Sequence, residues 1–359
     1  MNDFRSFKQT KRVPAKAMEP VIDPAGWDAQ TLGSVENFSY AISDRDADEL
    51  VAGIAAFRRH GVAIEQVSRH NFPLRGFAEV LADMRRELID GRGIVILRDF
   101  PVDRLDREEQ AIAYLGLGAY LGQAMSQNKH GHILGHVKDL GGDYADANTR
   151  GYMTRAEMRF HSDACDYVGL LCLHAAKSGG ASRVASSVTV YNRMLARRPD
   201  LARALCEDLY RSRSGEIDPG EAPWIKHPIF CFAEGYFSAI GLGAAVDKAQ
   251  KLPGVPPFTA AQKEAIALYR TTVEECAADM DFRAGDIQFL NNFVTLHTRR
   301  EYQDWPEPER KRHLLRLWLS DPDSRPLLKE LREGRSGRGV HLKGVKLVAP
   351  LDVNEAAAA

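Results

Sequence analysis

The stretch FHSDACD at 160–166 contains an imidazole and a carboxylate, His161 and Asp163, two positions apart. Side chains at i and i+2 of an extended segment point to the same face. The apolar run VGLLCL at 168–173 follows closely, so both polar groups would face the interior. Burying them without partners costs free energy, and a bound metal ion would offset that cost. The spacing therefore makes these residues candidate metal ligands.

A third candidate ligand lies in the segment GDIQFLNNFVTLHTRR, where His297 ends an apolar run that follows a Gly-Asp turn. Two histidines and one carboxylate on one side of a metal form the facial triad of non-haem Fe(II) oxygenases. That geometry leaves coordination positions open for a cosubstrate and O₂. The residue types therefore favour Fe(II) held by His161, Asp163 and His297.

Two arginines follow in the segment KRHLLRLWL, at Arg312 and Arg316. An arginine inside an otherwise apolar strand requires a buried anion. Its planar guanidinium group binds carboxylates through two parallel hydrogen bonds. The segment therefore predicts a clamp for the far carboxylate of a dicarboxylic acid.

Taken in order, the HSD tripeptide, the glycine-bounded strand ending in His297 and the RxxxR pair resemble the TauD/TfdA family. Its members are Fe(II)- and 2-oxoglutarate-dependent oxygenases with a double-stranded β-helix, or jelly-roll, fold. The resemblance covers roughly residues 90–320. It implies that His161, Asp163 and His297 are the iron ligands and that Arg312 binds the C5 carboxylate of 2-oxoglutarate.

The resemblance also implies further binding residues. The run GGAS at 179–182 is similar to the family's GGxT turn, so Ser182 stands where a threonine usually contacts 2-oxoglutarate. Arg316 matches the second arginine of the family pair, which in some members meets an anionic group of the substrate. We expect Arg316 to contact the substrate and 2-oxoglutarate. The implied reaction uses Fe(II), 2-oxoglutarate and O₂ to hydroxylate, desaturate or cyclise an unactivated C–H bond, and it releases succinate and CO₂.

The expected substrate is a small polar molecule, such as an amino acid or a carboxylate derivative. Glu157 and Arg159 share parity with His161, so a continuous strand would direct all three to one face. The alternative is an irregular lid over 151–158, in which parity fails. Gln127 and Asn128 are expected to border the same pocket.

Other interpretations of these residues stay open at this point. His161 and Asp163 could be an ordinary pair of polar residues at the end of a surface strand. His297 could be a core histidine with its hydrogen bonds satisfied. Arg312 and Arg316 could be the solvated ends of a basic stretch. Two other functions are compatible with the same ligands, a zinc hydrolase and a non-catalytic jelly-roll module that binds a small molecule. A zinc hydrolase would not explain the arginine pair. A non-catalytic module would tolerate loss of the metal ligands, and all three are present here.

Amphipathic helices and short strands must position these groups. Helical periodicity and glycine or capping signals predict helices over 44–58, 77–90, 106–122 and 262–280. The run GRGIVILRDF at 91–100 predicts a strand, and short strand-like pieces dominate after about residue 130. Two of them, in PIFCFAEGYFSA, flank a Glu234-Gly235 turn. Helices followed by many strands indicate a mainly β fold with flanking helices (α+β), with a jelly-roll core.

This pattern divides the chain into four parts. We expect a polar N-terminal arm over 1–25, a helical segment over 26–90 that packs on the core, a jelly-roll oxygenase domain over 91–323 and a C-terminal tail over 324–359. The oxygenase domain carries a helical insertion at about 191–282.

Composition narrows the class of partner. The 48 basic and 49 acidic residues nearly cancel, which argues against nucleic acid or a membrane surface as a partner. No apolar run approaches a membrane span. Five cysteines without a CxxC pair favour a reducing compartment. We therefore expect a cytoplasmic enzyme with a small-molecule substrate, and the sequence leaves a homo-oligomer open.

Overall fold

The runs rich in aliphatic residues form the centre of a mixed β-sheet. The computed structural model describes residues 11–141, 154–333 and 339–352. Four strands form the middle of this larger sheet, in the order β2 (Ile94–Arg98), β13 (Ile287–Asn291), β5 (Tyr167–His174) and β16 (His313–Ser320). Its edges are β1 (Ser39–Ala41), β3 (Gln123–Ala124) and β4 (Leu134–Val137), the last two pairing with β16.

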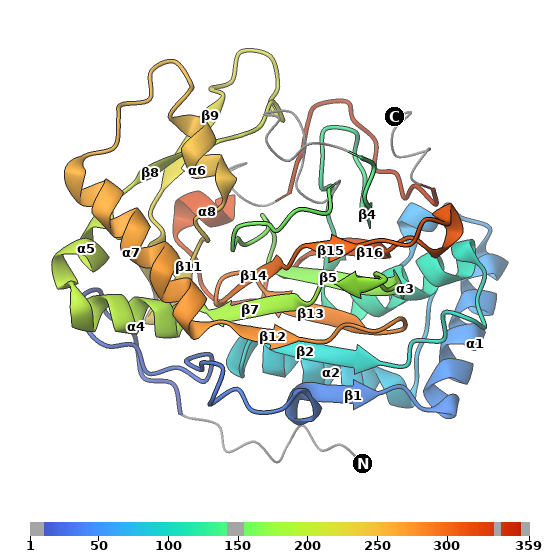
Figure 1. The fold of residues 1–359 in the computed structure, drawn as a ribbon. Helices are drawn as coiled ribbons and strands as arrows, with labels where there is room; N and C mark the ends of the chain where they lie inside the picture. Colours follow the sequence, from blue (N-terminus) through green and yellow to red (C-terminus); the bar gives the residue numbers. More distant parts are fainter. Residues whose placement is uncertain (1–10, 142–153, 334–338, 353–359) are drawn as a thin grey trace.

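A smaller sheet lies beside the larger one and completes the jelly-roll core (Figure 1). Its order is β12 (Ala278–Met280), β7 (Ser182–Ser186) and β14 (Thr295–Arg299), and both pairings are antiparallel. A short pair, β6 (Ser178–Gly179) and β15 (Tyr302–Gln303), continues from it. The predicted fold class, mainly β with flanking helices around a jelly roll, is confirmed.

Helices cover the larger sheet on its outer face (Figure 1). The helices α1 (Asp44–His60), α2 (Gly76–Asp90) and α3 (Arg107–Leu121) share one apolar cluster with β2, β5, β13 and β16. Ser43 caps α1 in a capping box with Asp46; of the two caps that the sequence offers for this helix, Ser43 and Asp44, the structure has the first. Single turns of 3₁₀ helix lie at Val35–Phe38, Ile64–Gln66 and Pro308–Arg310.

The insertion contains strands as well as helices. The short helix α8 (Lys329–Glu333) follows the insertion and contributes Leu331 to a separate apolar cluster. Within the insertion, a second apolar cluster joins α4 (Ser187–Arg197), α5 (Pro199–Ala204), α6 (Ala244–Ala249) and α7 (Ala260–Cys276). Two hairpins separate them, β8 (Leu209–Ser212) with β9 (Trp224–His227) and β10 (Phe230–Ala233) with β11 (Tyr236–Ala239).

Two sequence predictions in this insertion have different outcomes. The hairpin around Glu234 and Gly235 is confirmed, and both turn residues have positive φ, 50° and 78°. The helix predicted over 262–280 was too long, because α7 ends at Cys276 and Ala278–Met280 form β12. Pairing of β12 with β7 replaces the last turn of helix with ladder hydrogen bonds.

Segments near the two ends of the chain meet through a buried ion pair. Asp23 binds both Nη atoms of Arg325 at 2.9 Å, and it also accepts from Arg12 at 2.8 Å. The Arg325 guanidinium also donates to the carbonyl of Ile89. Burial opposes the ionised carboxyl, but the neighbouring guanidinium groups hold the pKa of Asp23 below its usual value. Residues 1–10, 334–338 and 353–359 of the predicted arm and tail lie outside the described residues.

Replacing Asp23 by alanine should destabilise the protein strongly. Removal of one partner from a buried pair leaves an uncompensated charge, which costs about 3–5 kcal/mol. Urea unfolding measures the change in the free energy of unfolding. Asp200→Ala, which removes the exposed partner of Arg198, is the matched control and should leave the free energy of unfolding close to the wild-type value, because water screens exposed ion pairs. Equal effects of the two substitutions would contradict the prediction.

None of the helices in the described part of the chain is both long and apolar enough to span a membrane. All five cysteines are unpaired, and four of them are buried.

Candidate metal centre

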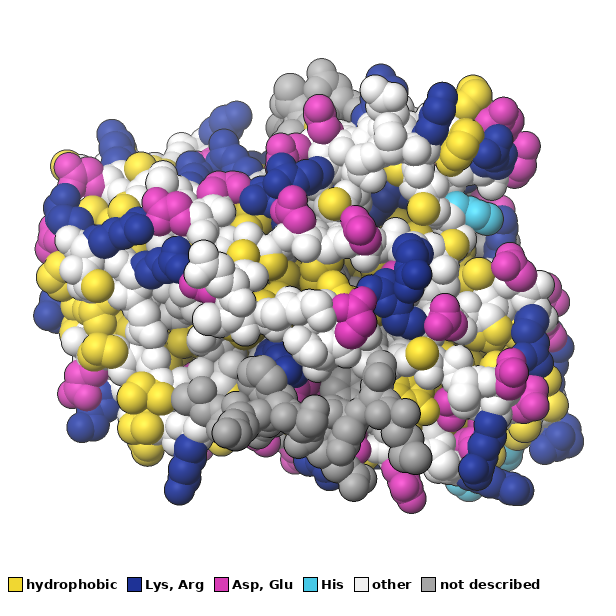
Figure 2. Space-filling model, turned by 60° about the horizontal axis from the view of Figure 1, so that its bottom comes forward, with side chains coloured by type: hydrophobic (Ala, Val, Ile, Leu, Met, Phe, Trp, Pro, Cys, Tyr) yellow, Lys and Arg dark blue, Asp and Glu magenta, His cyan; other side chains and the backbone are white. Residues whose placement is uncertain are grey.

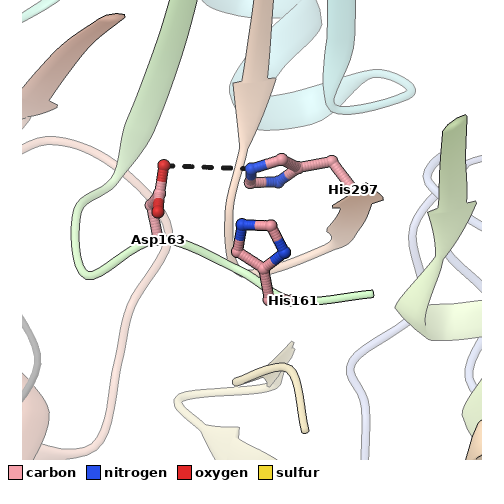
Figure 3. A group of neighbouring side chains, drawn as sticks. All are labelled: His161, Asp163 and His297. Carbon is pink, nitrogen blue, oxygen red and sulfur yellow. Dashed lines mark ion pairs between the residues drawn. The ribbon is translucent and has the colours of Figure 1, made fainter. Parts of the chain in front are cut away.

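Three side chains from two distant segments meet at one end of the jelly roll (Figure 3). His161 and His297 form an isolated antiparallel bridge, with reciprocal N–H···O bonds of 3.0 and 2.9 Å. Asp163 follows two residues after His161 and faces the same space. One potential ligand atom from each of the three residues lies within 4.8 Å of the other two. The structure therefore brings together the three predicted ligands.

The histidines are held in a state suited to binding a cation. Nδ1 of His161 lies 2.9 Å from the carbonyl oxygen of Arg159, which accepts a ring N–H and leaves the lone pair on Nε2. Nε2 of His297 lies 3.8 Å from Oδ2 of Asp163. Burial, with His161 alongside, lowers the pKa of His297 to about 3, so its imidazole is neutral. Within the described chain, Nδ1 of His297 is buried without a hydrogen-bond partner.

The carboxylate of Asp163 is ionised despite its burial. Burial alone would raise its pKa, but the charge of Arg316, the two histidines and a hydrogen bond from Trp318 together hold that pKa below its usual value. Two imidazoles and one ionised carboxylate thus converge on one point. This is the donor set that suits Fe(II), so the residues present fit the ion.

A cavity of about 60 Å³, open to solvent on one side, lies beside the three side chains. The larger sheet and the smaller sheet both contribute to its wall. Apolar side chains line part of it, namely Val137, Met158, Leu170, Phe282 and Leu314. The polar part consists of Ser182, Thr298, Arg299, Arg312 and Arg316 in addition to the three candidate ligands.

Arg312 is a buried cation at the wall of this cavity. Its backbone N–H donates to Oδ1 of Asp304 at 2.7 Å, and its guanidinium lies 5.1 Å from the centre of the Tyr302 ring. No carboxylate among the described residues forms an ion pair with it, and Nη1 has no hydrogen-bond partner there. Burial lowers the pKa of Arg312, although guanidinium remains charged. The site therefore favours an incoming anion.

The other two predicted cosubstrate residues also line the cavity. Ser182, at the start of β7, donates its hydroxyl to Oε1 of Gln288 at 3.1 Å. Arg316, on β16, donates from Nε to Oε1 of Gln127 at 2.8 Å, and its Nη1 lies 3.5 Å from Oδ1 of Asp163. Arg316 therefore lies against the candidate metal carboxylate.

Gln127 and Asn128, which were predicted to border the pocket, form hydrogen bonds with other residues of the protein. Gln127 is buried, and its Nε2 donates to the carbonyls of Ile133 and Arg316. Asn128 accepts from the backbone N–H groups of His130 and His132, which holds a turn. The Gln127 amide therefore joins Ile133 to β16, the Asn128 amide holds the turn at 128–132, and neither residue lines the cavity.

Glu157 and Arg159 lie outside the cavity lining. Residues 157–160 do not form a strand, so the prediction that Glu157, Arg159 and His161 share one face is wrong. The alternative, an irregular segment, describes residues 154–158. Residues 151–153 of that segment lie outside the described chain. Both side chains are exposed: Glu157 lies 3.7 Å from Arg183, and Arg159 pairs with Asp247. Met158, between them, lines the cavity instead.

Sequence reasoning missed two cavity residues and one neighbour. Arg299 lies two residues after His297 on β14, and Trp318 lies two residues after Arg316 on β16. The parity rule that linked His161 with Asp163 would have placed both beside the site. Phe282 carried no such signal, because it follows a strand edge in an irregular segment.

Comparisons with known proteins agree with this geometry. The family model described as taurine catabolism dioxygenase TauD, TfdA family, matches residues 35–318. FR-33289 synthase of Streptomyces rubellomurinus is 29% identical over 329 residues, which cover 89% of this chain and 96% of the synthase. The taurine hydroxylase-like protein SAT17 of Stachybotrys chartarum is 28% identical over 314 residues, covering 84% of this chain and 80% of SAT17.

Solved structures share the fold at low identity. An asparagine oxygenase in complex with Fe(II), 2S,3S-3-hydroxyasparagine and succinate has a TM-score of 0.62 and 20% identity, covering 79% of this chain and 93% of that one. The non-heme iron oxygenase OrfP in complex with Fe, succinate and (3S)-hydroxy-L-Arg has a TM-score of 0.60 and 13% identity, covering 79% and 94%. With the family match over most of its length, the chain belongs to the TauD/TfdA family and is an Fe(II)- and 2-oxoglutarate-dependent dioxygenase.

Proposed function

We propose that His161, Asp163 and His297 hold Fe(II), that Arg312 and Ser182 hold 2-oxoglutarate, and that the enzyme oxidises a small anionic substrate of the amino-acid type. The observation that carries this proposal is the convergence of the three ligands beside a buried arginine without an acidic partner. When bound, Fe(II) and 2-oxoglutarate supply the oxidation of a C–H bond by O₂, with release of succinate and CO₂.

The chain's own residues bind and orient these groups. The guanidinium of Arg312 gives the far carboxylate of 2-oxoglutarate two parallel donors. The hydroxyl of Ser182 supplies a third donor once it rotates away from Gln288, to which it donates in the ligand-free protein. The ring of His161 is held in its orientation by the contact of its Nδ1 with the Arg159 carbonyl. The apolar side chains Met158, Phe282 and Leu314 exclude water from the reacting groups.

The charge of the cavity supports an anionic substrate. Among the described residues that line it, three guanidinium groups, those of Arg299, Arg312 and Arg316, face a single carboxylate. The structural neighbours were solved with hydroxylated asparagine or hydroxylated arginine and succinate, and one curated relative is named taurine hydroxylase-like. A small zwitterion with a carboxylate or a comparable acid group fits both observations.

A substrate screen tests this proposal. The Fe(II)-loaded enzyme is incubated with 2-oxoglutarate, ascorbate and single amino acids or their acidic derivatives, and succinate and product masses are measured. We expect succinate to rise with one group of these compounds, together with a gain of one oxygen for hydroxylation or a loss of two hydrogens for desaturation or cyclisation. A metal-loaded protein that neither binds nor consumes 2-oxoglutarate would contradict the proposal.

The cytoplasm is the compartment that we propose for this activity. Its support is that all five cysteines are unpaired, as a reducing compartment would keep them.

A further inference from the structure

The indole of Trp318 contacts the candidate metal carboxylate directly. Its Nε1–H donates to Oδ2 of Asp163 at 2.9 Å. The Trp318 side chain is only 6% exposed and packs in an apolar cluster with Val168 and Leu290. An indole has one donor and no acceptor, so a buried Trp places its polar atom where a fixed acceptor is available.

The second carboxylate oxygen faces another residue of the same strand. Arg316, two positions before Trp318 on β16, has Nη1 3.5 Å from Oδ1 of Asp163. Its guanidinium also lies 5.0 Å from the centre of the Trp318 ring. Gln127 fixes the direction of Arg316 through its bond to Nε and through its own bonds to two backbone carbonyls. One face of β16 therefore holds both oxygens of the carboxylate.

The backbone of Asp163 is held from the opposite direction. Its N–H donates to Oδ1 of Asn292 at 3.0 Å, and the amide of Asn292 is turned by a contact of 3.1 Å to Sγ of Cys165. Asn292 lies in the turn between β13 and β14, which leads to His297. The position of the main chain and the rotation of the carboxylate are thus set by separate groups.

We propose that Trp318 is a positioning residue for the metal ligand: its N–H fixes the rotation of the Asp163 carboxylate before the ion arrives. The inference rests on the proposed metal site and adds to it a residue that touches neither ion nor cosubstrate. A ligand held in its binding orientation loses little conformational entropy on binding. Loss of a hydrogen-bond partner outside the coordination shell typically costs about 10–100-fold in metal affinity.

The test compares two buried tryptophans in the same apolar cluster. Trp318→Phe keeps an aromatic ring and removes the N–H. The matched control is Trp27→Phe, because Trp27 is 3% exposed and donates its own Nε1–H at 2.8 Å to the carbonyl of Arg92, away from the metal centre. Both substitutions delete one buried hydrogen bond. Calorimetric titration of the chelator-treated full-length proteins with Co(II) measures each dissociation constant, without any assay of turnover.

We expect the dissociation constant for Co(II) to rise about 10–100-fold in Trp318→Phe and to stay within about threefold of wild type in Trp27→Phe. Unchanged affinity in a folded Trp318→Phe protein would overturn the inference while leaving the metal site intact. Equal weakening in both variants would also overturn it, because the effect would then be a general loss of packing. A wild-type protein that binds no Co(II) would instead overturn the metal site itself.

A second measurement uses the wild-type protein and does not depend on folding of Trp318→Phe. The four tryptophans, Trp27, Trp224, Trp305 and Trp318, give four indole N–H signals in a ¹⁵N-labelled sample, and Phe variants of the first three assign them. Zn(II) serves as a diamagnetic probe. The Trp318 signal should shift on addition of Zn(II), and the Trp27 signal should stay in place. A stationary Trp318 signal under conditions where Zn(II) binds would overturn the inference.

Discussion

Replacement of Asp163 by alanine should abolish succinate formation while the protein remains folded. Asp163 is the only carboxylate of the metal-binding group found among the described residues, and its ionised state is maintained by Arg316 and Trp318. Two histidines alone would leave the ion weakly held and one coordination position unfilled. Loss of a hydrogen-bond partner outside the coordination shell already lowers metal affinity or activity by about 10–100-fold. Loss of the ligand itself should therefore reduce kcat/KM by more than about 100-fold.

Two measurements separate this effect from misfolding. Circular dichroism and thermal unfolding should show a folded Asp163→Ala protein, because the substitution shortens one side chain at a cavity wall. Asp279→Ala is the control: it removes a carboxylate that pairs with Arg183 and Arg300 and does not line the cavity, and it should retain activity. Full turnover by Asp163→Ala would remove Asp163 from the proposed site.

Replacement of Arg312 by methionine should raise the KM for 2-oxoglutarate by roughly 30-fold or more. Truncation of one partner of a buried hydrogen-bonded charge pair costs about 2–5 kcal/mol, and each 1.4 kcal/mol is about tenfold in an equilibrium constant. Methionine has a similar length without the charge, so the cavity keeps its apolar wall. Affinity for the metal should change little, because the three ligands and Trp318 are unaltered.

Thermal unfolding gives an independent test of the same residue. Ligand-free Arg312 is a buried cation that burial disfavours, so an anion bound to it should stabilise the folded state. For wild type, 2-oxoglutarate at 100 times its dissociation constant should add about 2.7 kcal/mol, and Arg312→Met should lose most of that gain. Arg300→Met, at a half-exposed arginine paired with Asp279, is the control. An unchanged KM and unchanged stabilisation in Arg312→Met would exclude the proposed clamp.

Local patterns were sufficient for much of the fold. A cap at Ser43 or Asp44 and the apolar periodicity that follows it predicted α1, and the Glu234-Gly235 turn predicted the β10–β11 hairpin. Such features depend on residues only a few positions apart, whose contacts follow from helix and turn geometry. The end of α7 did not follow in this way, because Ala278–Met280 pair with β7, a strand far away in the sequence.

For the site, the sequence by itself determined the kinds of residue available: two histidines, a carboxylate and an arginine pair, in the order of the TauD/TfdA pattern. Only the tertiary structure decided which side chains face them. Backbone pairing with β14 is limited to a single bridge at His161, and residues 157–160 form no strand; Glu157 and Arg159 are exposed there, and Met158 lines the cavity. The register of β16 against β5 brings Trp318 to the carboxylate. Strand pairing joins residues distant in the chain, and a shift of one residue would reverse every inward side chain, so these neighbours follow from packing rather than from spacing.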